Sequence, residues 1–199
     1  MDAKAEENGW KNIQWPEIGN RSRFEDAPDD PAALRRAVEA AVEKVGASLP
    51  VFTDRFPHVS VGNVYRPEEN KLWTAAFFPG MAYLACDITG DEDYLRYRNR
   101  YRDSFARRLE SGPVDTHDLG FLYMLSCVSD YRHTGSREAC DTALRAAGLL
   151  LRRYNPRGGY IQAWGKMGLT YPDVKIIIDC MMNLPLLYWA SAETGRARD

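Results

Sequence analysis

Two aspartates, Asp118 and Asp179, stand at equivalent places in a repeated pattern and could do chemistry as a pair. Each precedes an apolar stretch that ends on a Thr-Gly dipeptide, with Asp118 16 residues before Thr134 and Asp179 15 residues before Thr194. If both stretches are helical, a rise of 1.5 Å per residue places the carboxylates roughly 22–24 Å from the same end of their helices. Two carboxylates at one level, facing each other across a cleft, are the usual equipment for acid/base chemistry on a glycosidic bond.

Each aspartate also has a structural interpretation. Asp118 directly precedes the apolar residues 119–122, so it could cap the N-terminus of a helix. Asp179 lies between the apolar triplets 176–178 and 180–182, and burial there would raise the pKa of its carboxyl toward that of a proton donor near neutral pH. A structural hydrogen-bonded network would perturb the pKa in the same way, so both interpretations stay open.

Three further residues could bind a substrate beside these aspartates. His117 precedes Asp118 and could orient a substrate or tune the carboxylate, although a histidine beside a helix start is also common for structural reasons. Trp73 stands in the preceding repeat at the level of the two aspartates, and Trp164 lies in a Gly-bounded loop ahead of Asp179. A loop aromatic near a cleft can stack on sugar faces, with simple packing as the alternative for Trp164.

A nearly continuous helical pattern positions these residues. Residues 1–30 are rich in Asn, Gly, Asp and Pro and are expected to form a flexible arm. Asp30 and Pro31 then suit the N-cap and the first position of a helix over 31–48. Beyond Leu72 the helical pattern dominates and a convincing strand pattern is absent, so the fold is predicted to be all-α.

Three Thr-Gly turns define an internal repeat of helical hairpins. Gly90, Gly135 and Gly195 supply the left-handed residue that ends a helix. Asp91 and Ser136 can cap the helices that follow. Apolar inner helices thus alternate with amphipathic, Arg-rich outer helices, which could curl into part of an α/α toroid or stack as a solenoid. The predicted outer–inner pairs are 31–48 with 73–88, 91–110 with 118–133, and 136–154 with 177–194.

Composition narrows the possible partners. The chain has 199 residues with 28 acidic and 26 basic side chains, a net charge of −2 that argues against nucleic-acid binding. No apolar run approaches the ~20 residues of a membrane helix, so no membrane contact is expected. The polar first residues lack a signal-peptide core, which predicts a cytoplasmic protein. The four cysteines form no C-x-x-C pair, so a zinc site is not expected and they are interpreted as small buried hydrophobes.

Several motifs of the chain occur in a specific order. They are Arg55–Ser60 (RFPHVS), Trp73-Thr74, Thr116–Tyr123 (THDLGFLY), Ile161–Gly165 (IQAWG) and Ile176–Leu187 (IIIDCMMNLPLL). Together they resemble the unsaturated glucuronyl hydrolases of glycoside hydrolase family 88. The similarity extends from about residue 33 to the end of the chain.

The resemblance implies a six-hairpin (α/α)6 barrel that removes 4,5-unsaturated glucuronic acid from the non-reducing end of lyase-generated oligosaccharides. In that reaction a general acid protonates C4 of the C4=C5 double bond, its conjugate base helps water add at C5, and the hemiketal opens and expels the rest of the chain. By resemblance Asp179 matches the acid/base and Asp118 the second essential carboxylate. His117, Trp73 and Trp164 match residues that line the sugar pocket. The resemblance implies no metal and no organic cofactor.

Members of the resembled family are about twice as long as this chain. Residues 31–199 therefore correspond to the N-terminal half of the toroid domain, with about three hairpins. Half of a closed barrel would expose the apolar flanks of its inner helices, and a homodimer could cover them. Two functions remain open: hydrolysis of unsaturated uronyl oligosaccharides, or a truncated, non-catalytic remnant that binds oligosaccharide or a helical partner.

Overall fold

The computed structural model of the chain describes residues 30–166 and 175–195. The predicted flexible arm, residues 1–30, lies outside this part except for its last residue. The chain divides into two units, residues 1–39 and 40–199. As predicted, helices dominate. They are α2 (Pro31–Ser48), α3 (Phe77–Thr89), η2 (Glu92–Leu95), α4 (Arg98–Ser111), α5 (Leu119–Tyr123), η3 (Met124–Val128), α6 (Ser129–Thr134), α7 (Arg137–Leu151), η4 (Ile178–Met182) and α8 (Leu184–Thr194).

The predicted helix ends are confirmed by their hydrogen bonds. Asp30 Oδ1 accepts from the backbone N–H groups of Ala32 and Ala33 at 3.0 and 2.9 Å, which caps α2. Asp91 and Ser136 cap η2 and α7 in the same manner. Gly90, Gly135 and Gly195 end α3, α6 and α8 with φ of +72°, +69° and +65°, where a side chain would be strained. The Thr-Gly repeat is therefore a repeated helix stop.

Several predicted helices are shorter or interrupted. The helix expected over 73–88 begins at Phe77, and the one over 136–154 ends at Leu151. The one expected over 91–110 is split into η2 and α4, and the one over 118–133 contains the π-helical turn η3. The helix expected over 177–194 is a 3₁₀ turn followed by α8, because Pro185 has no N–H to donate and fits only the first turn of a helix.

Two short hairpins interrupt the helices, although no strand is predicted from the sequence; the fold as a whole is all-α, as predicted. β1 (Ser60–Val61) pairs with β2 (Val64–Tyr65), and the turn between them has positive φ at both Gly62 and Asn63, the geometry of a type I′ turn. β3 (Tyr154–Asn155) pairs with β4 (Tyr160–Ile161) directly after α7. Both strand pairs are too short to show the alternating pattern that predicts strands from sequence.

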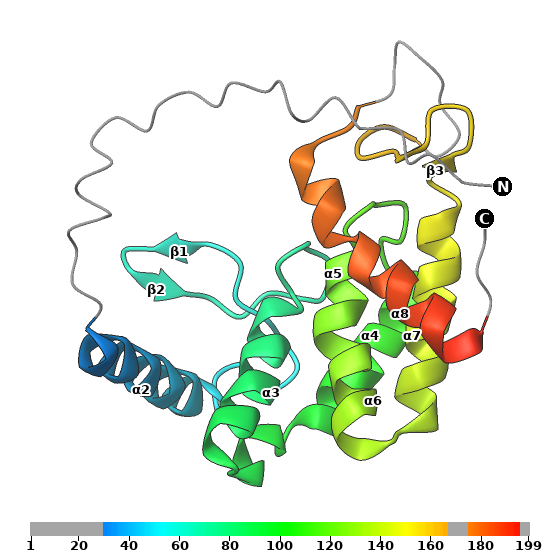
Figure 1. Cartoon of the computed structure of the whole chain (residues 1–199). Coiled ribbons are helices and arrows are strands. Elements are labelled where there is room, and N and C mark those ends of the chain that lie inside the picture. The colour runs from blue at the N-terminus through cyan, green and yellow to red at the C-terminus, as the bar shows by residue number, and fades with distance from the viewer. Residues whose placement is uncertain (1–29, 167–174, 196–199) are drawn as a thin grey trace, which may run out of the picture. The chain divides into compact units, whose positions relative to one another are not determined.

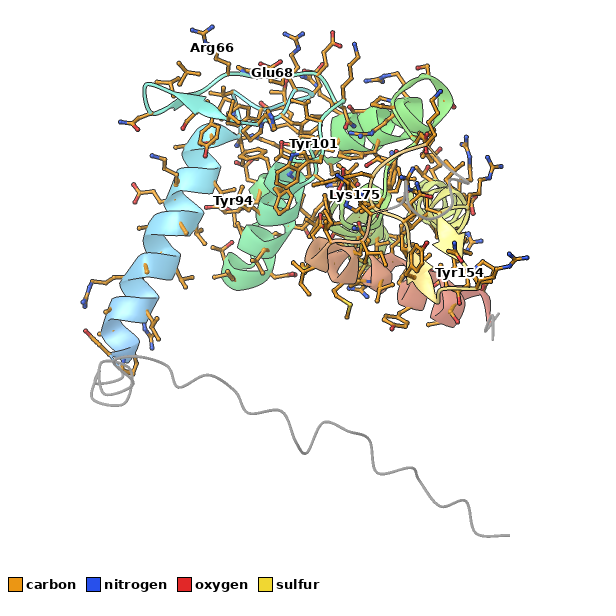
Figure 2. The ribbon with its side chains drawn as sticks, turned by 90° about the horizontal axis from the view of Figure 1, so that it is seen from above. Arg66, Glu68, Tyr94, Tyr101, Tyr154 and Lys175 are labelled. Atoms are coloured by element: carbon orange, nitrogen blue, oxygen red, sulfur yellow. The ribbon has the colours of Figure 1, made fainter. Side chains whose placement is uncertain are left out.

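The core of residues 40–199 lies among α4, α5, η3, α7 and α8. Within this unit α4 contacts η3 and α7 contacts α8, as the predicted outer–inner pairs require, and α5 contacts both α7 and α8 (Figure 1). Buried tyrosines satisfy their hydroxyl groups on backbone carbonyls. Tyr101, labelled in Figure 2, donates to Phe52 O at 2.9 Å, and Tyr123 donates to Phe105 O at 2.9 Å. The four cysteines are buried and unpaired, as predicted.

One face of α3 is apolar and exposed. Its exposed side chains are Phe77, Met81, Leu84 and Ile88, whose spacing of four, three and four residues forms one stripe along the helix. Ile178, Met181 and Met182 of η4 are also exposed. These are inner elements of the predicted toroid, so their exposure matches the expectation for an open arrangement of hairpins. No helix in the described part of the chain is long and apolar enough to cross a membrane.

Candidate active site

Asp118 and Asp179 meet at one nitrogen of His117. The Nε2 atom of His117 lies 3.1 Å from Asp179 Oδ2 and 3.3 Å from Asp118 Oδ1, and only 5% of the histidine side chain is exposed. Because an ionised carboxylate only accepts hydrogen bonds, Nε2 carries the proton when both aspartates are charged. The structure thus brings together three of the residues selected from the sequence, although 61 positions separate Asp118 from Asp179 along the chain.

The carboxylate of Asp118 does not cap a helix. Asp118 occupies the N-cap position of α5, but its side chain makes no capping hydrogen bond there. Instead Oδ2 accepts from Thr116 Oγ1 at 2.7 Å, and the backbone N–H of Asp118 donates to the same hydroxyl at 3.2 Å. Both oxygens of Asp118 therefore have partners, and 18% of its side chain is exposed. The N-cap interpretation is wrong, because the carboxylate is turned to Thr116 and His117.

Asp179 is held less completely than Asp118. It belongs to the 3₁₀ turn η4, and 41% of its side chain is exposed. The expectation of a carboxylate buried among apolar neighbours is wrong, since Ile178 and Met181 on either side of it are themselves exposed. One atom is nevertheless enclosed: within the described part of the chain, Oδ1 is buried without a hydrogen-bond partner. An acceptor left in this state is unfavourable unless another group reaches it.

A close backbone contact joins the two aspartate segments. A Cβ added to Gly120 would lie 2.2 Å from the Cα of Asn183, so only glycine permits this approach. The fully buried Asn183 side chain accepts from Phe121 N at 3.1 Å and donates to Asp179 O at 3.3 Å. One amide therefore ties the start of α5 to the turn that carries Asp179.

Trp73 lies close to the start of α5. Its ring packs edge-on against Phe121 and Phe77 at centroid distances of 6.0 and 5.9 Å, while half of the side chain stays exposed. The buried Arg108 anchors the preceding segment by donating to Asn70 Oδ1 at 3.0 Å and Leu72 O at 2.9 Å. Burial lowers the pKa of the Arg108 guanidinium, and the negative charge of Asp118 opposes this shift.

Trp164 lies beside the segment that leads into Asp179. Its backbone forms an isolated bridge with Lys175, and the Lys175 ammonium lies 5.4 Å from the centroid of its ring (Figure 2 labels Lys175). Trp164 is 53% exposed, so its indole is not part of the hydrophobic core. Simple packing, the structural alternative for Trp164, therefore explains only the buried part of its side chain.

Arg153 holds the Trp164 loop in place. Its buried guanidinium donates to Gln162 O at 2.9 Å, Ala163 O at 2.8 Å and Gly165 O at 2.9 Å, and it also pairs with Asp115 at 2.5 Å. Because Asp115 lies two residues before His117, this arginine connects the loop to the segment of the first aspartate.

Sequence reasoning missed the residues that hold the site together, namely Thr116, Gly120, Arg153 and Asn183. Asn183 carried a signal, because it is a lone amide inside the apolar run 180–187, where burial demands hydrogen-bond partners. Gly120 carried a weaker one, a glycine inside an expected helix. Arg153 carried none, since it looks like any basic residue at a helix end.

Known proteins are similar to this chain in sequence and in fold. No protein-family model matches the chain. The unsaturated glucuronyl hydrolase of Bacillus sp. strain GL1 is 42% identical over 163 residues, which cover 81% of this chain and 43% of that protein. The solved unsaturated glucuronyl hydrolase of Streptococcus agalactiae is 33% identical with a TM-score of 0.80, covering 92% of this chain and 47% of its own. A solved Asp-to-Asn variant from the same species, complexed with dGlcA-GalNAc6S, is 27% identical with a TM-score of 0.75 and covers 92% of this chain and 44% of its own.

The helical hairpins and their fold neighbours define the fold of the chain as part of the α/α toroid of the unsaturated glucuronyl hydrolases. Its sequence is similar to that of the unsaturated glucuronyl hydrolases and corresponds to the N-terminal half of those proteins. It spans less than half of the length of the relatives it matches.

Proposed function

We propose that the chain carries the acid/base part of a site that hydrates the C4=C5 double bond of an unsaturated glucuronic acid at the non-reducing end of an oligosaccharide. The observation that carries the proposal is the meeting of Asp118 and Asp179 at His117 Nε2. Solved relatives support the substrate class, because one of them holds an unsaturated disaccharide.

In the proposed reaction Asp179 is the general acid and base. Its carboxyl proton moves to C4 of the enol ether, and the new carboxylate then takes a proton from the water whose oxygen bonds to C5. The resulting hemiketal opens and releases the remaining saccharide. The exposure of the Asp179 side chain supports this role, because a proton donor has to be reached by the substrate, and 41% of this side chain is exposed.

Asp118 and His117 are proposed to fix the acid and to bind the substrate. With both of its oxygens already held, Asp118 is better suited to hold His117 and a sugar hydroxyl than to exchange protons. The histidine in turn orients Asp179 through the 3.1 Å contact. Trp73 and Trp164 are exposed aromatic surfaces on which sugar rings can stack.

The experiment follows the double bond directly. An unsaturated chondroitin disaccharide absorbs in the ultraviolet because its C4=C5 bond is conjugated with the carboxylate. Addition of the purified chain at micromolar concentration should remove this absorbance and yield products that have gained one water. Absorbance that stays constant would refute the catalytic proposal and leave a binding role, which calorimetric titration with the same disaccharide would then measure.

We also propose that the exposed apolar stripe of α3 pairs with a second copy of the chain. Four large apolar side chains on one helix face exceed what isolated surface residues require. Sedimentation velocity should show a dimer at micromolar concentration that Leu84→Glu converts to monomer. Val61→Glu, at an exposed apolar residue of β1, is the matched control and should leave the dimer intact. A monomer in all three samples would refute the pairing.

A further inference from the structure

A third potential ligand lies beside the His117–Asp179 pair. The Sγ atom of Cys180, a ring nitrogen of His117 and a carboxylate oxygen of Asp179 all lie within 4.8 Å of one another. Cys180 is 8% exposed, and its thiol contacts Ile161 O at 3.5 Å. Within the described residues no other group of three such ligands is as closely spaced.

The chemistry of these three atoms suits a thiophilic divalent cation. Zn²⁺ binds thiolate, imidazole and carboxylate with bonds of about 2.0–2.3 Å, which separates tetrahedral ligand atoms by roughly 3.3–3.8 Å. The 3.1 Å between His117 Nε2 and Asp179 Oδ2 is already close to this range. The thiol lies within 4.8 Å of both atoms, so it needs to move by about 1.0–1.5 Å at most. The fourth position would be water, as in zinc sites with three protein ligands.

The unpartnered oxygen of Asp179 is an independent sign. Oδ1 is buried without a hydrogen-bond donor in the described part of the chain, and a buried acceptor in this state marks a place where an ion or water fits. The charge of the surroundings agrees, since Asp118 adds a second carboxylate 3.3 Å from the same histidine nitrogen. A cation would neutralise this local excess of negative charge.

We infer that His117, Asp179 and Cys180 form an inhibitory binding site for a thiophilic divalent cation such as Zn²⁺. Binding replaces the thiol proton of Cys180, which passes to the buffer, by a metal–sulfur bond. The proton of His117 moves from Nε2 to Nδ1 so that the Nε2 lone pair binds the metal, and no oxidant or reductant is needed. The inhibition rests on the proposed function, because the cation would occupy the acid/base Asp179 and its partner His117. The binding itself does not rest on it, since all three ligands belong to this chain.

The test of binding uses Co²⁺, which fills zinc sites and gives an ultraviolet charge-transfer band when a thiolate is bound. Titration of the purified chain should produce this band with one equivalent of Co²⁺, and Zn²⁺ should remove it. Cys180→Ser should abolish the band. Cys86→Ser, at another buried cysteine on α3, should keep it. Absence of the band in the unaltered chain, or its persistence in Cys180→Ser, would overturn the site.

A second measurement needs no variant and therefore does not depend on how Cys180→Ser folds. Zn²⁺ should slow alkylation of Cys180 by iodoacetamide about tenfold or more, while alkylation of Cys86 is unchanged, as mapped by mass spectrometry of peptides. If the alkylation rate of Cys180, like that of Cys86, is the same with and without Zn²⁺, the site is overturned. Where the chain hydrates the disaccharide, Zn²⁺ should inhibit it, and Cys180→Ser should require at least tenfold more Zn²⁺ than Cys86→Ser. A cobalt band without hydration would keep the metal site and refute the proposed function.

Discussion

The segments around Asp118 and Asp179 carry the same side chain to the same histidine but hold it in different ways. Asp118 stands directly before the short helix α5, and its oxygens are held by Thr116 and His117. Asp179 sits in a 3₁₀ turn with one oxygen on His117 and the other without a partner in the described residues. Asp118, with both oxygens held and 18% of its side chain exposed, is suited to hold a position. Asp179, with 41% of its side chain exposed, is better placed to transfer a proton to a substrate.

The largest expected effect tests the proton-transfer side of this comparison. Asp179→Asn keeps the shape and the contact with His117 but removes the transferable proton, so hydration should fall by about 10²–10⁴-fold. The rate of ultraviolet absorbance loss measures this directly. Thermal unfolding should stay within a degree or two of the unaltered chain, because the lost carboxylate is 41% exposed. Unchanged turnover would end the assignment of Asp179 as the acid/base.

The contact between the two segments can be broken at Gly120. Gly120→Ala places a methyl group 2.2 Å from Asn183 Cα, and backbone atoms on both sides must move to admit it. We expect the free energy of unfolding to fall by about 3 kcal/mol in denaturant titrations, the upper range for overpacking. Gly148→Ala is the matched control, because this helical glycine of α7 has no atom within 4 Å of its added Cβ. It should gain about 0.5–1 kcal/mol. Equal effects at both positions would show that the close approach is absent.

Loss of the Asn183 side-chain amide, which joins the two segments, should lower the free energy of unfolding slightly less than Gly120→Ala does. Asn183→Ala leaves the N–H of Phe121 without its acceptor and removes the donor to Asp179 O, both in a fully buried place. A lost buried partner costs about 1–3 kcal/mol, so unfolding should become about 2 kcal/mol easier. The loss of the bond to Asn183 is visible in hydrogen exchange of the Phe121 amide, whose protection against exchange should drop. Retained protection at Phe121 would mean that another acceptor replaces Asn183.

How far the sequence predicts the fold differs between these features. Helix stops at Gly90, Gly135 and Gly195 depend on local backbone conformation, so a Thr-Gly pattern is sufficient to find them. The break between η4 and α8 was missed although Pro185 signals it, because the apolar pattern continues through it. The β1–β2 hairpin was missed because two-residue strands leave no periodicity.

The site shows the same division between local and long-range information. Residue types and repeat spacing selected Asp118, Asp179 and His117, since chemistry and helical rise are local properties. Contacts such as Gly120 with Asn183 are decided by which helices pack together, which one sequence does not state. The lack of a hydrogen-bond partner for Asp179 Oδ1 among the described residues is also long-range information, because it depends on which side chains of other elements lie beside it.

The smallest effect is expected on the positioning side of the comparison, at Thr116. Thr116→Val keeps the volume but removes the hydroxyl that donates to Asp118 Oδ2 at 2.7 Å and accepts from Asp118 N. One hydrogen bond to a charged group is worth about 1.5–3 kcal/mol, and partial exposure of Asp118 lets water replace much of it, so unfolding should become about 1 kcal/mol easier. Hydration should fall about tenfold or less, because Asp179 keeps its proton. Thr116→Ser should restore both quantities, since serine supplies the same hydroxyl. A loss as large as that of Asp179→Asn would contradict the division of roles and make the two carboxylates equal partners in proton transfer.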